Sequence, residues 1–286
     1  MRLITCEYEG VVVHGVVDGE EIALIGTGDL AGIVAGDPTT PNGRRVALQD
    51  VRILPPLRSP GKVIAVAANY QEHVTESGAR PRDVRTASPR LFLKPDTSVV
   101  GDGAEVVLPS ITTELDWEAE LAVVIGRTAR EVREEDALGH VFGYATSNDL
   151  SARSLALEGP RDGEAWTGFF DWLEGKWLDG SAPLGPYLVT ADEVPDPQRL
   201  TVGLTVNGQV RQSGTTADMI HSVAELVAFS SRLMTLRPGD VILTGTPAGV
   251  GATTGTFLHP GDVVVAEIQG LGALTTRIVA PSSEDR

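Results

Sequence analysis

The stretch Glu114-Leu115-Asp116-Trp117-Glu118-Ala119-Glu120-Leu121-Ala122-Val123-Val124-Ile125 carries an acid at every second position and then becomes apolar. In a β-strand, side chains alternate between the two faces, so the four acids would share one face, with neighbours roughly 6.5–7 Å apart. Trp117, Ala119 and Leu121 would take the opposite, core-facing side. Like charges on one face repel each other, and partial burial increases this repulsion.

Two interpretations of the acidic face are open from this segment alone. A hard divalent cation such as Mg²⁺, Mn²⁺ or Ca²⁺ would relieve the repulsion, because these ions take carboxylate oxygens as ligands. A solvated edge strand whose charges discourage aggregation would explain the pattern equally well. The first interpretation predicts a buried metal site, and the second predicts an exposed sheet edge.

Composition indicates a globular chain with many turns. Of the 286 residues, 42% are hydrophobic and 22% are charged, which is typical of globular proteins. The 32 glycines and 18 prolines separate short β-like runs, which favours a β-rich architecture. The net charge of −16 and the lack of a basic patch argue against nucleic-acid and membrane partners. A small anionic substrate stays compatible with this charge, because a bound metal reverses the local field.

Cysteine usage and the N-terminal residues predict a cytoplasmic protein. The single cysteine, Cys6, excludes an internal disulfide and fits a reducing compartment. The N-terminus lacks the pattern of a signal peptide, and no apolar run approaches the ~20 residues that span a bilayer. We interpret Cys6 as a buried or half-buried residue, because no feature of the sequence places a base beside it.

Pro55-Pro56 marks a predicted domain boundary. Residues 1–57 are expected to form a small N-terminal β-rich domain, and residues 58–286 a larger second domain. In the second domain we expect strands at 62–68, 90–94, 241–243, 263–268 and 273–279, a hairpin at Asn207-Gly208, and helices after Asn69, at 134–138 and at 219–233. We expect a mobile loop at residues 78–90 and a long, partly ordered loop with aromatic anchors at residues 158–180.

Asp149 is the best candidate for a third ligand beside Glu118 and Glu120. It follows an apolar run and opens a polar segment, so it could sit at a strand end, although a lone Asp is more often a cap or turn residue. Three carboxylates and water suit Mg²⁺ or Mn²⁺. No cluster of Cys and His supports zinc.

Other candidates keep two interpretations each. His73 and Glu76 would share a helix face and could form a general base, or they could be an inconsequential surface pair. Lys176 could stabilise an oxyanion or be solvated, and Lys94 and Arg153 have the same ambiguity. The glycine-rich residues 244–251 lack the ending of a P-loop, and they could hold a small carboxylate or form a plain turn.

Together these segments resemble the fumarylacetoacetate hydrolase family over about residues 61–279. The resemblance rests on ordered motifs: Lys62-Val63-Ile64, Asn69-Tyr70 with His73, Phe92-Leu93-Lys94-Pro95, Asp116-x-Glu118-x-Glu120-Leu121, Gly143-Tyr144, Asn148-Asp149-Leu150-Ser151-Ala152-Arg153, Gly175-Lys176, Pro183-Leu184-Gly185-Pro186, Asn207-Gly208, Pro238-Gly239-Asp240 and Thr244-Gly245-Thr246-Pro247-Ala248-Gly249-Val250-Gly251. The first 55 residues look like the small N-terminal domain of many bacterial members.

The resemblance implies an α+β, β-rich fold, in which mixed β-sheets roll into a barrel-like sandwich, and a homodimer. It implies that Glu118, Glu120 and Asp149 hold Mg²⁺ or Mn²⁺, with Ca²⁺ able to replace them in crystals. His73 and Glu76 then belong to a lid helix, and Lys176 matches the active-site lysine. Thr246 matches a threonine that contacts substrate, and we assign Lys94 and Arg153 to substrate binding as well.

The implied activity is hydrolysis of a C–C bond in an acylpyruvate or related β-diketo acid, by water activated at His73 and Glu76 and an enolate stabilised by the metal. The alternative is an isomerase of the 2-hydroxyhepta-2,4-diene-1,7-dioate type or an oxaloacetate-type decarboxylase, within aromatic compound catabolism. Two departures keep the alternative open. Ala68 stands where family hydrolases often have Arg, and Ser154, Leu155 and Ala156 stand where Asp-x-Gln is common. A non-catalytic binding protein is a third hypothesis, against which the intact site residues argue.

Overall fold

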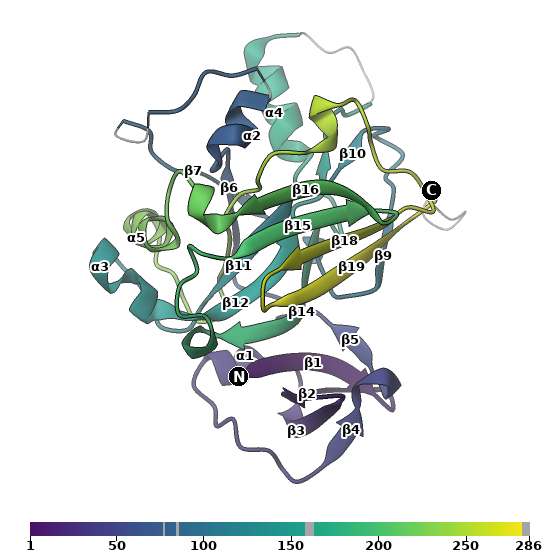
Figure 1. Ribbon diagram of the computed structural model, residues 1–286, viewed down its shortest axis with the longest axis vertical. Helices are drawn as coiled ribbons and strands as arrows, with labels where there is room; N and C mark the ends of the chain where they lie inside the picture. The colour runs from purple at the N-terminus through teal and green to yellow at the C-terminus, as the bar shows by residue number, and fades with distance from the viewer. Residues whose placement is uncertain (77, 84–85, 158–162, 282–286) are drawn as a thin grey trace.

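The computed structural model describes residues 1–76, 78–83, 86–157 and 163–281. Strands dominate it, which confirms the expected β-rich α+β class. Figure 1 shows the N-terminal strands at one end of the molecule and α4 and α2 at the other, with the crossed sheets between them.

The largest sheet runs through the whole molecule. Its strands are β1 (Arg2–Tyr8), β2 (Val11–Asp18), β3 (Glu21–Thr27), β4 (Arg45–Ala47), β5 (Arg52–Leu54), β6 (Val63–Ala67), β7 (Arg90–Lys94), β8 (Val99–Val100), β11 (Ala119–Ile125), β12 (Val141–Asn148), β14 (Ala182–Thr190) and β17 (Val241–Leu243). Among the described residues the order is β4-β3-β2-β1-β14-β12-β11-β17-β6-β7, with β5 beside β1 and β8 beside β14. The unbroken apolar run of β11 reflects burial of both its faces: Leu121, Val123 and Ile125 pack in one core, and Ala122 and Val124 pack in another.

A second sheet packs across the first one. It contains β9 (Ala104–Val107), β15 (Thr201–Val206), β16 (Gln209–Thr215), β18 (Val263–Ile268) and β19 (Gly272–Val279), in the order β16-β15-β18-β19-β9. Alternating residues of the two sheets, such as Leu121, Val123, Leu204 and Val264, form the main hydrophobic core. β10 (Leu115–Asp116) and β13 (Ser151–Ala152) make a separate short pair. The predicted hairpin and C-terminal strands are confirmed, with β19 starting one residue early.

Helices are few and short. They are α1 (Ala31–Val34), α2 (Gln71–Glu76), α3 (Glu134–Ala137), α4 (Ala165–Glu174) and α5 (Val223–Leu233), with 3-10 turns at Leu48–Asp50, Asp96–Ser98, Leu138–His140, Ala191–Glu193, Thr216–Asp218 and Gly251–Thr253. Among the described residues, none has the length and apolar character that crossing a bilayer requires.

Three local expectations were wrong. The helix expected from residue 219 begins at Val223, because the Ser222 side chain accepts the Glu225 N–H and caps it there. The stretch expected to be a long loop contains α4, while residues 158–162 of that prediction lie outside the described residues. Asn69 does not cap α2, since its side chain bonds the backbone of His221 and Thr244.

The N-terminal strands have a core of their own but join the large sheet. Ile4, Cys6, Val13, Ile22, Leu24 and Val46 form this second core, and Cys6 is fully buried in it. β1 pairs with β14 through Arg2 opposite Val189 and Leu3 opposite Leu188. The sheet is therefore continuous between the two parts of the chain, and the division at residue 57 stays a prediction.

Candidate active site

The acidic stretch enters the interior rather than forming an edge. β10 ends at Asp116 and β11 begins at Ala119, so the segment is two short strands joined through Trp117 and Glu118. Asp116, Glu118 and Glu120 are 0%, 5% and 1% exposed, which excludes the interpretation as a solvated edge. Trp117 and Ala119 face the main core on the opposite side, as alternation predicts.

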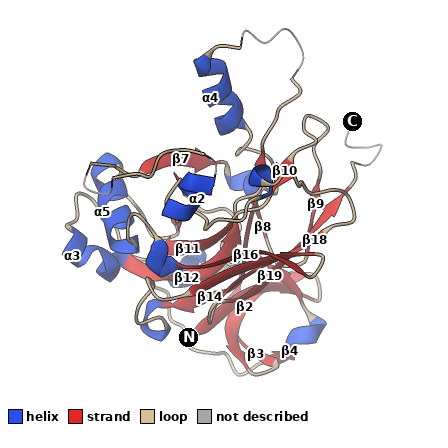
Figure 2. Ribbon diagram, turned by 45° about the horizontal axis from the view of Figure 1, so that its top comes forward, coloured by secondary structure: helices blue, strands red, loops and turns tan. Residues whose placement is uncertain are grey.

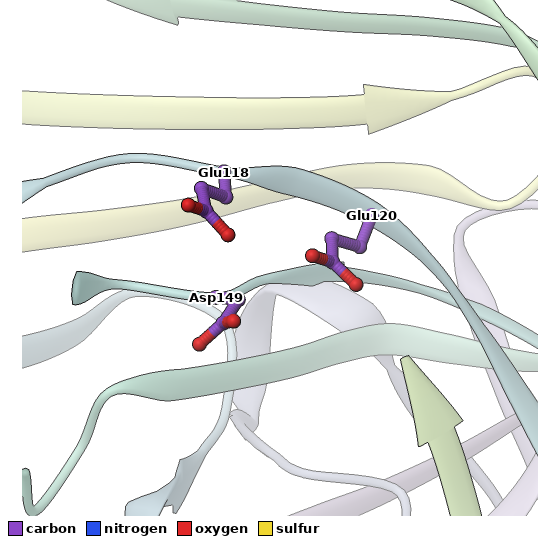
Figure 3. A group of neighbouring side chains, drawn as sticks. All are labelled: Glu118, Glu120 and Asp149. Carbon is purple, nitrogen blue, oxygen red and sulfur yellow. The ribbon is translucent and has the colours of Figure 1, made fainter. Parts of the chain in front are cut away.

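Strand register brings Asp149 to Glu118 and Glu120. In the antiparallel pair of β11 and β12, Ala119 lies opposite Asn148, so the residue after β12 meets the start of β11. The backbone N–H of Asp149 donates to the carbonyl of Glu118 at 2.8 Å. One carboxylate oxygen from each of Glu118, Glu120 and Asp149 lies within 4.8 Å of the others. Figure 3 shows Glu118 and Glu120 extending from the same side of the ribbon, with Asp149 beside them.

Two buried lysines and the partly buried Arg153 surround these acids. The Lys176 ammonium donates to Glu118 Oε2 and Asp149 Oδ2, at 2.8 Å each. Lys94 donates to Asp149 Oδ1 at 2.6 Å and to the carbonyl of Lys176 at 2.5 Å. Arg153 joins Asp116 Oδ2 at 2.8 Å and Glu118 Oε1 at 2.6 Å. These contacts compensate the burial of Glu118 and Asp149, because an unpaired charge in the interior is costly.

The pKa shifts divide the cluster into paired and unpaired acids. Burial alone would raise the pKa of Glu118, but the charges of Lys176 and Arg153 outweigh it and hold that pKa below its usual range. Burial and then the charges of Asp149 and Glu118 raise the pKa of Glu120 well above its ordinary value. Glu120 therefore carries the unrelieved repulsion of the site.

The two lysines respond in opposite directions. Burial lowers the pKa of Lys94, which has Asp149 as its nearest acid. Burial also acts to lower the pKa of Lys176, but the charges of Asp149 and Glu118 prevail and raise it. Lys176 is thus held as an ammonium between two of the acids.

The acidic group fits a hard divalent ion. The family-implied ligands offer only oxygen atoms, and oxygens on an octahedral Mg²⁺ are spaced roughly 3–4 Å apart, which is close to the spacing found. The oxygens of Glu118 and Asp149 already accept ammonium or guanidinium hydrogens, but each keeps a second lone pair. A cation here would also remove the repulsion that raises the pKa of Glu120.

His73 and Glu76 form a hydrogen-bonded pair on α2. His73 Nδ1 lies 2.7 Å from Glu76 Oε1, and the other Glu76 oxygen accepts the Gly249 N–H at 2.8 Å. The pair is mostly buried, with the side chains 19% and 18% exposed, so it is not an open surface pair. His73 lines the same pocket as the three acids.

The glycine-rich residues 244–251 do bind carboxylates, but those of the protein itself. The N–H groups of Gly245, Gly249 and Gly251 donate to Glu120, Glu76 and Asp116, at 2.7, 2.8 and 2.6 Å. Gly249 has φ +104°, and a Cβ there would lie 2.1 Å from the carbonyl oxygen of Arg211. This close backbone approach requires glycine. One loop thereby fixes the acidic group and the His73–Glu76 pair relative to each other.

Thr246 and Gln212 bind the loop to β11. The Thr246 hydroxyl donates to the carbonyl of Ala119 at 2.9 Å and accepts from Gln212 Nε2 at 2.8 Å. Gln212 also accepts the Ala119 N–H at 2.9 Å and donates to the carbonyl of Pro247 at 2.8 Å. Sequence reasoning missed Gln212. It stands out only in the structure, where its amide occupies the one buried position of β16.

The acidic group, its cations and His73 line one large pocket of about 1060 Å³. The sequence-predicted residues that line it are His73, Lys94, Glu118, Glu120, Asp149, Arg153, Lys176 and Thr246. Glu76 does not line the pocket itself but is hydrogen-bonded to His73, which does. The structure therefore brings together every candidate site residue, from segments distant in the sequence.

Comparison with known proteins identifies the family to which the chain belongs. Residues 62–279 match the family model described as fumarylacetoacetate (FAA) hydrolase C-terminal. The chain belongs to the fumarylacetoacetate hydrolase family. Residues 1–56 match a second model, described as Rv2993c-like, N-terminal. This family consists of enzymes that act on small substrates and typically depend on a divalent metal, so the buried acidic group agrees with membership.

Relatives within the family carry several activities. The chain is 42% identical to human mitochondrial oxaloacetate tautomerase FAHD2A over 233 residues, 80% of this chain and 70% of the relative. It is 38% identical to protein Rv2993c of Mycobacterium tuberculosis over 265 residues, 92% of each chain. Among solved structures, a 5-carboxymethyl-2-hydroxymuconate delta-isomerase from Mycobacterium smegmatis matches with TM-score 0.80 and 35% identity, over 98% of this chain and all of that one. A fumarylacetoacetate hydrolase from Exiguobacterium antarcticum matches with TM-score 0.84 and 33% identity, at the same coverage.

Proposed function

We propose that this protein is a divalent-metal-dependent hydrolase that cleaves a C–C bond in an acylpyruvate or related β-diketo acid. The observation that carries the proposal is that the His73–Glu76 pair and the acidic group Glu118, Glu120 and Asp149 face one pocket. Without the three acids, the pocket would have no ligands for a divalent cation that binds the anionic substrate. Without the His73–Glu76 pair, it would have no base to activate water.

Glu118, Glu120 and Asp149 would hold the ion, for which Mg²⁺ or Mn²⁺ is the best match to their oxygens. Bound there, the ion supplies Lewis-acid polarisation of the 2-oxo acid end of the substrate and stabilises negative charge. Arg153 and Thr246 line the same pocket and are proposed as substrate contacts. Lys94 also lines the pocket, but its side chain is fully buried and two of its three hydrogens bind Asp149 and the carbonyl of Lys176, so we propose that it acts by positioning Asp149.

His73 takes a proton from a water molecule, and Glu76 orients the ring and stabilises the charge that the ring gains. The water oxygen adds to the distal carbonyl, and Lys176 offers its remaining N–H to the resulting oxyanion, since two of its three hydrogens bind Glu118 and Asp149. The C–C bond then breaks, its electron pair stays with the pyruvate fragment, and the proton on His73 returns to that carbon. The products are pyruvate and a carboxylic acid.

Tautomerisation is the second candidate, and the relatives favour it. The chain is 42% identical to an oxaloacetate tautomerase and 35% identical to a muconate isomerase. In this reaction His73 would move a proton between carbon and oxygen, and no water would attack. An oxaloacetate-type decarboxylase would use the same pocket and release CO₂. A homodimer, a cytoplasmic location and a role in aromatic compound catabolism remain proposals from the family resemblance and the composition.

Product analysis separates the candidates. The purified protein is incubated with 2-oxo and 2,4-dioxo acids, with and without EDTA, while pyruvate, CO₂ and the enol absorbance are recorded. Pyruvate together with a second acid supports the hydrolase. Loss of enol absorbance at constant mass supports the tautomerase, and CO₂ supports the decarboxylase. Turnover that survives complete chelation would contradict all three, because each depends on the bound divalent ion.

The substitution His73→Ala tests the proposed base. We expect kcat to fall by roughly 10²–10⁴-fold, the usual contribution of acid–base help. Binding of Mn²⁺, measured by calorimetry, should stay unchanged, because His73 is not among the oxygen ligands. His259→Ala, at a 75% exposed histidine that does not line the pocket, is the matched control. Full turnover in the His73 variant would remove this residue from the mechanism.

A further inference from the structure

The pocket has a second surface that the proposed chemistry does not use. Six apolar residues line it, which we call the apolar wall: Leu91, Phe92 and Leu93 from β7, and Phe169, Trp172 and Leu173 from α4. Figure 2 shows α4 standing beyond β7 and α2, at the open side of the molecule. The wall is opposite in character to the charged residues at the base of the pocket.

Ring contacts hold the wall together. Phe92 and Trp172 meet edge to face with ring centroids 5.2 Å apart, and Trp172 also contacts Phe169 at 6.0 Å. The neighbouring Trp177 donates its indole N–H to the carbonyl of Leu93 at 2.9 Å. The Lys176 ammonium lies 5.6 Å from the Phe92 ring centroid, so the wall reaches the charged base of the pocket.

The wall is left partly open to water. Leu93 is 48% exposed, Phe169 is 47% exposed and the adjoining Trp177 is 44% exposed. Contiguous apolar surface of this kind is unfavourable in water and marks a binding site on a folded protein. The wall lines the same cavity as Glu118 and Lys176. A separate molecule bound to the wall would obstruct this cavity, so we expect the wall to bind part of the substrate itself.

The size of the pocket supports the same conclusion. Its volume of about 1060 Å³ lies just above the range of roughly 300–1,000 Å³ typical of sites for drug-sized ligands. A four-carbon diacid such as oxaloacetate would fill a small part of this space.

We propose that the preferred substrate is a 2-oxo acid whose distal end carries a bulky apolar group, aromatic or long aliphatic, which the apolar wall binds. This inference rests on the proposed function for the polar end of the substrate. It adds that substrate choice is made by β7 and α4, and that small polar diacids are poor substrates.

The first test is a chain-length series of acetyl-, hexanoyl- and benzoylpyruvate. We expect kcat/KM to rise by up to roughly fourfold for each methylene that becomes buried. In Phe169→Ala, KM for benzoylpyruvate should rise about tenfold with kcat retained, because the wall contributes binding and no chemistry. KM for acetylpyruvate should not change.

Phe170→Ala is the matched control. Phe170 follows Phe169 on α4 and is equally exposed, at 46%, but it does not line the pocket. Its ring contacts that of Phe169, with centroids 5.5 Å apart, so its removal should change the series far less than Phe169→Ala does. A flat chain-length series would overturn the apolar wall as a substrate site, and so would equal effects of the two substitutions. If both substitutions also dissociate a dimer in sedimentation, the wall is covered by a second copy and the proposal is wrong.

A binding experiment separates this proposal from the proposed function. Neither 4-phenyl-2-oxobutanoate nor 2-oxobutanoate has a distal carbonyl, so hydrolysis cannot occur. Calorimetry with Mn²⁺ present should show tighter binding of the phenyl compound to the unmodified protein, and no such preference in Phe169→Ala. This result without turnover of any dioxo acid would support the wall and overturn the hydrolase. Equal binding of the two compounds would overturn the wall, whatever the activity.

Discussion

The base of the pocket and the core of the N-terminal strands are equally buried but differ completely in composition. The N-terminal core is filled by Ile4, Cys6, Ile22 and similar side chains, and its stability needs only apolar burial. The base of the pocket instead buries Glu118, Glu120 and Asp149 with Lys94 and Lys176. Buried ion pairs lose several kcal/mol per ion in desolvation, and apolar replacements are often as stable. The charges at the base are therefore better explained by function than by folding.

The two regions also differ in how their residues depend on one another. In the N-terminal core each side chain fills space, so a loss is local. At the base of the pocket each charge has its partners on other segments, and Asp149 alone serves both Lys94 and Lys176. Substitutions in the two regions should therefore have different effects.

Asp149→Asn should have the largest effect. It leaves two buried ammonium groups without this carboxylate, so the free energy of unfolding should fall by about 3–5 kcal/mol, measured by urea denaturation without divalent ions. Mn²⁺ binding and turnover should be lost as well. The control Asp192→Asn changes a 75% exposed acid and should leave the free energy of unfolding nearly unchanged. An Asp149 variant with full stability and Mn²⁺ affinity would show that the charged residues at the base of the pocket depend on one another no more than the side chains of the N-terminal core do.

Gln212→Met should have an intermediate effect. The substitution keeps the volume but leaves the Ala119 N–H without its acceptor and frees Thr246 and Pro247. A buried donor without a partner costs about 1–3 kcal/mol. We expect kcat/KM to fall more than Mn²⁺ affinity, because the loop shifts while all three ligands remain. Gln209→Met, at an exposed position of the same strand, is the control. Unchanged kinetics would limit Gln212 to packing the sheets.

Alternation in the sequence correctly placed the acids of the 114–125 stretch opposite Trp117 and Ala119, since the pleat fixes faces locally. Spacing alone could not select Asp149, because its approach depends on the β11–β12 register. The partners of the glycine-rich loop were equally hidden, since backbone N–H groups of 245–251 find acids far away in the chain.

α4 was missed for a different reason. Its apolar residues Trp166, Phe169, Phe170 and Leu173 follow the i, i+3, i+4, i+7 pattern of a helix face. The Gly159-Pro160 pair near the start of the segment favoured a loop instead. The helical period was present in the sequence, and glycine and proline outweighed it in our interpretation.

Cys6 offers the smallest test and addresses the apolar side of the comparison. Burial in the N-terminal core raises the pKa of its thiol to about 11, so at pH 8 roughly one thiol in 10³ is a reactive thiolate. An aromatic disulfide reagent should label the folded protein very slowly and the urea-unfolded protein at the rate of a free thiol. Because the folded-state pKa lies above the ordinary value of 9.0, this group's contribution to stability is full below pH 9 and declines as pH rises toward 11. Cys6→Ala should remove that dependence, cost about 1 kcal/mol and leave turnover unchanged, whereas rapid labelling of the folded protein would show that the N-terminal core opens far more readily than its burial implies.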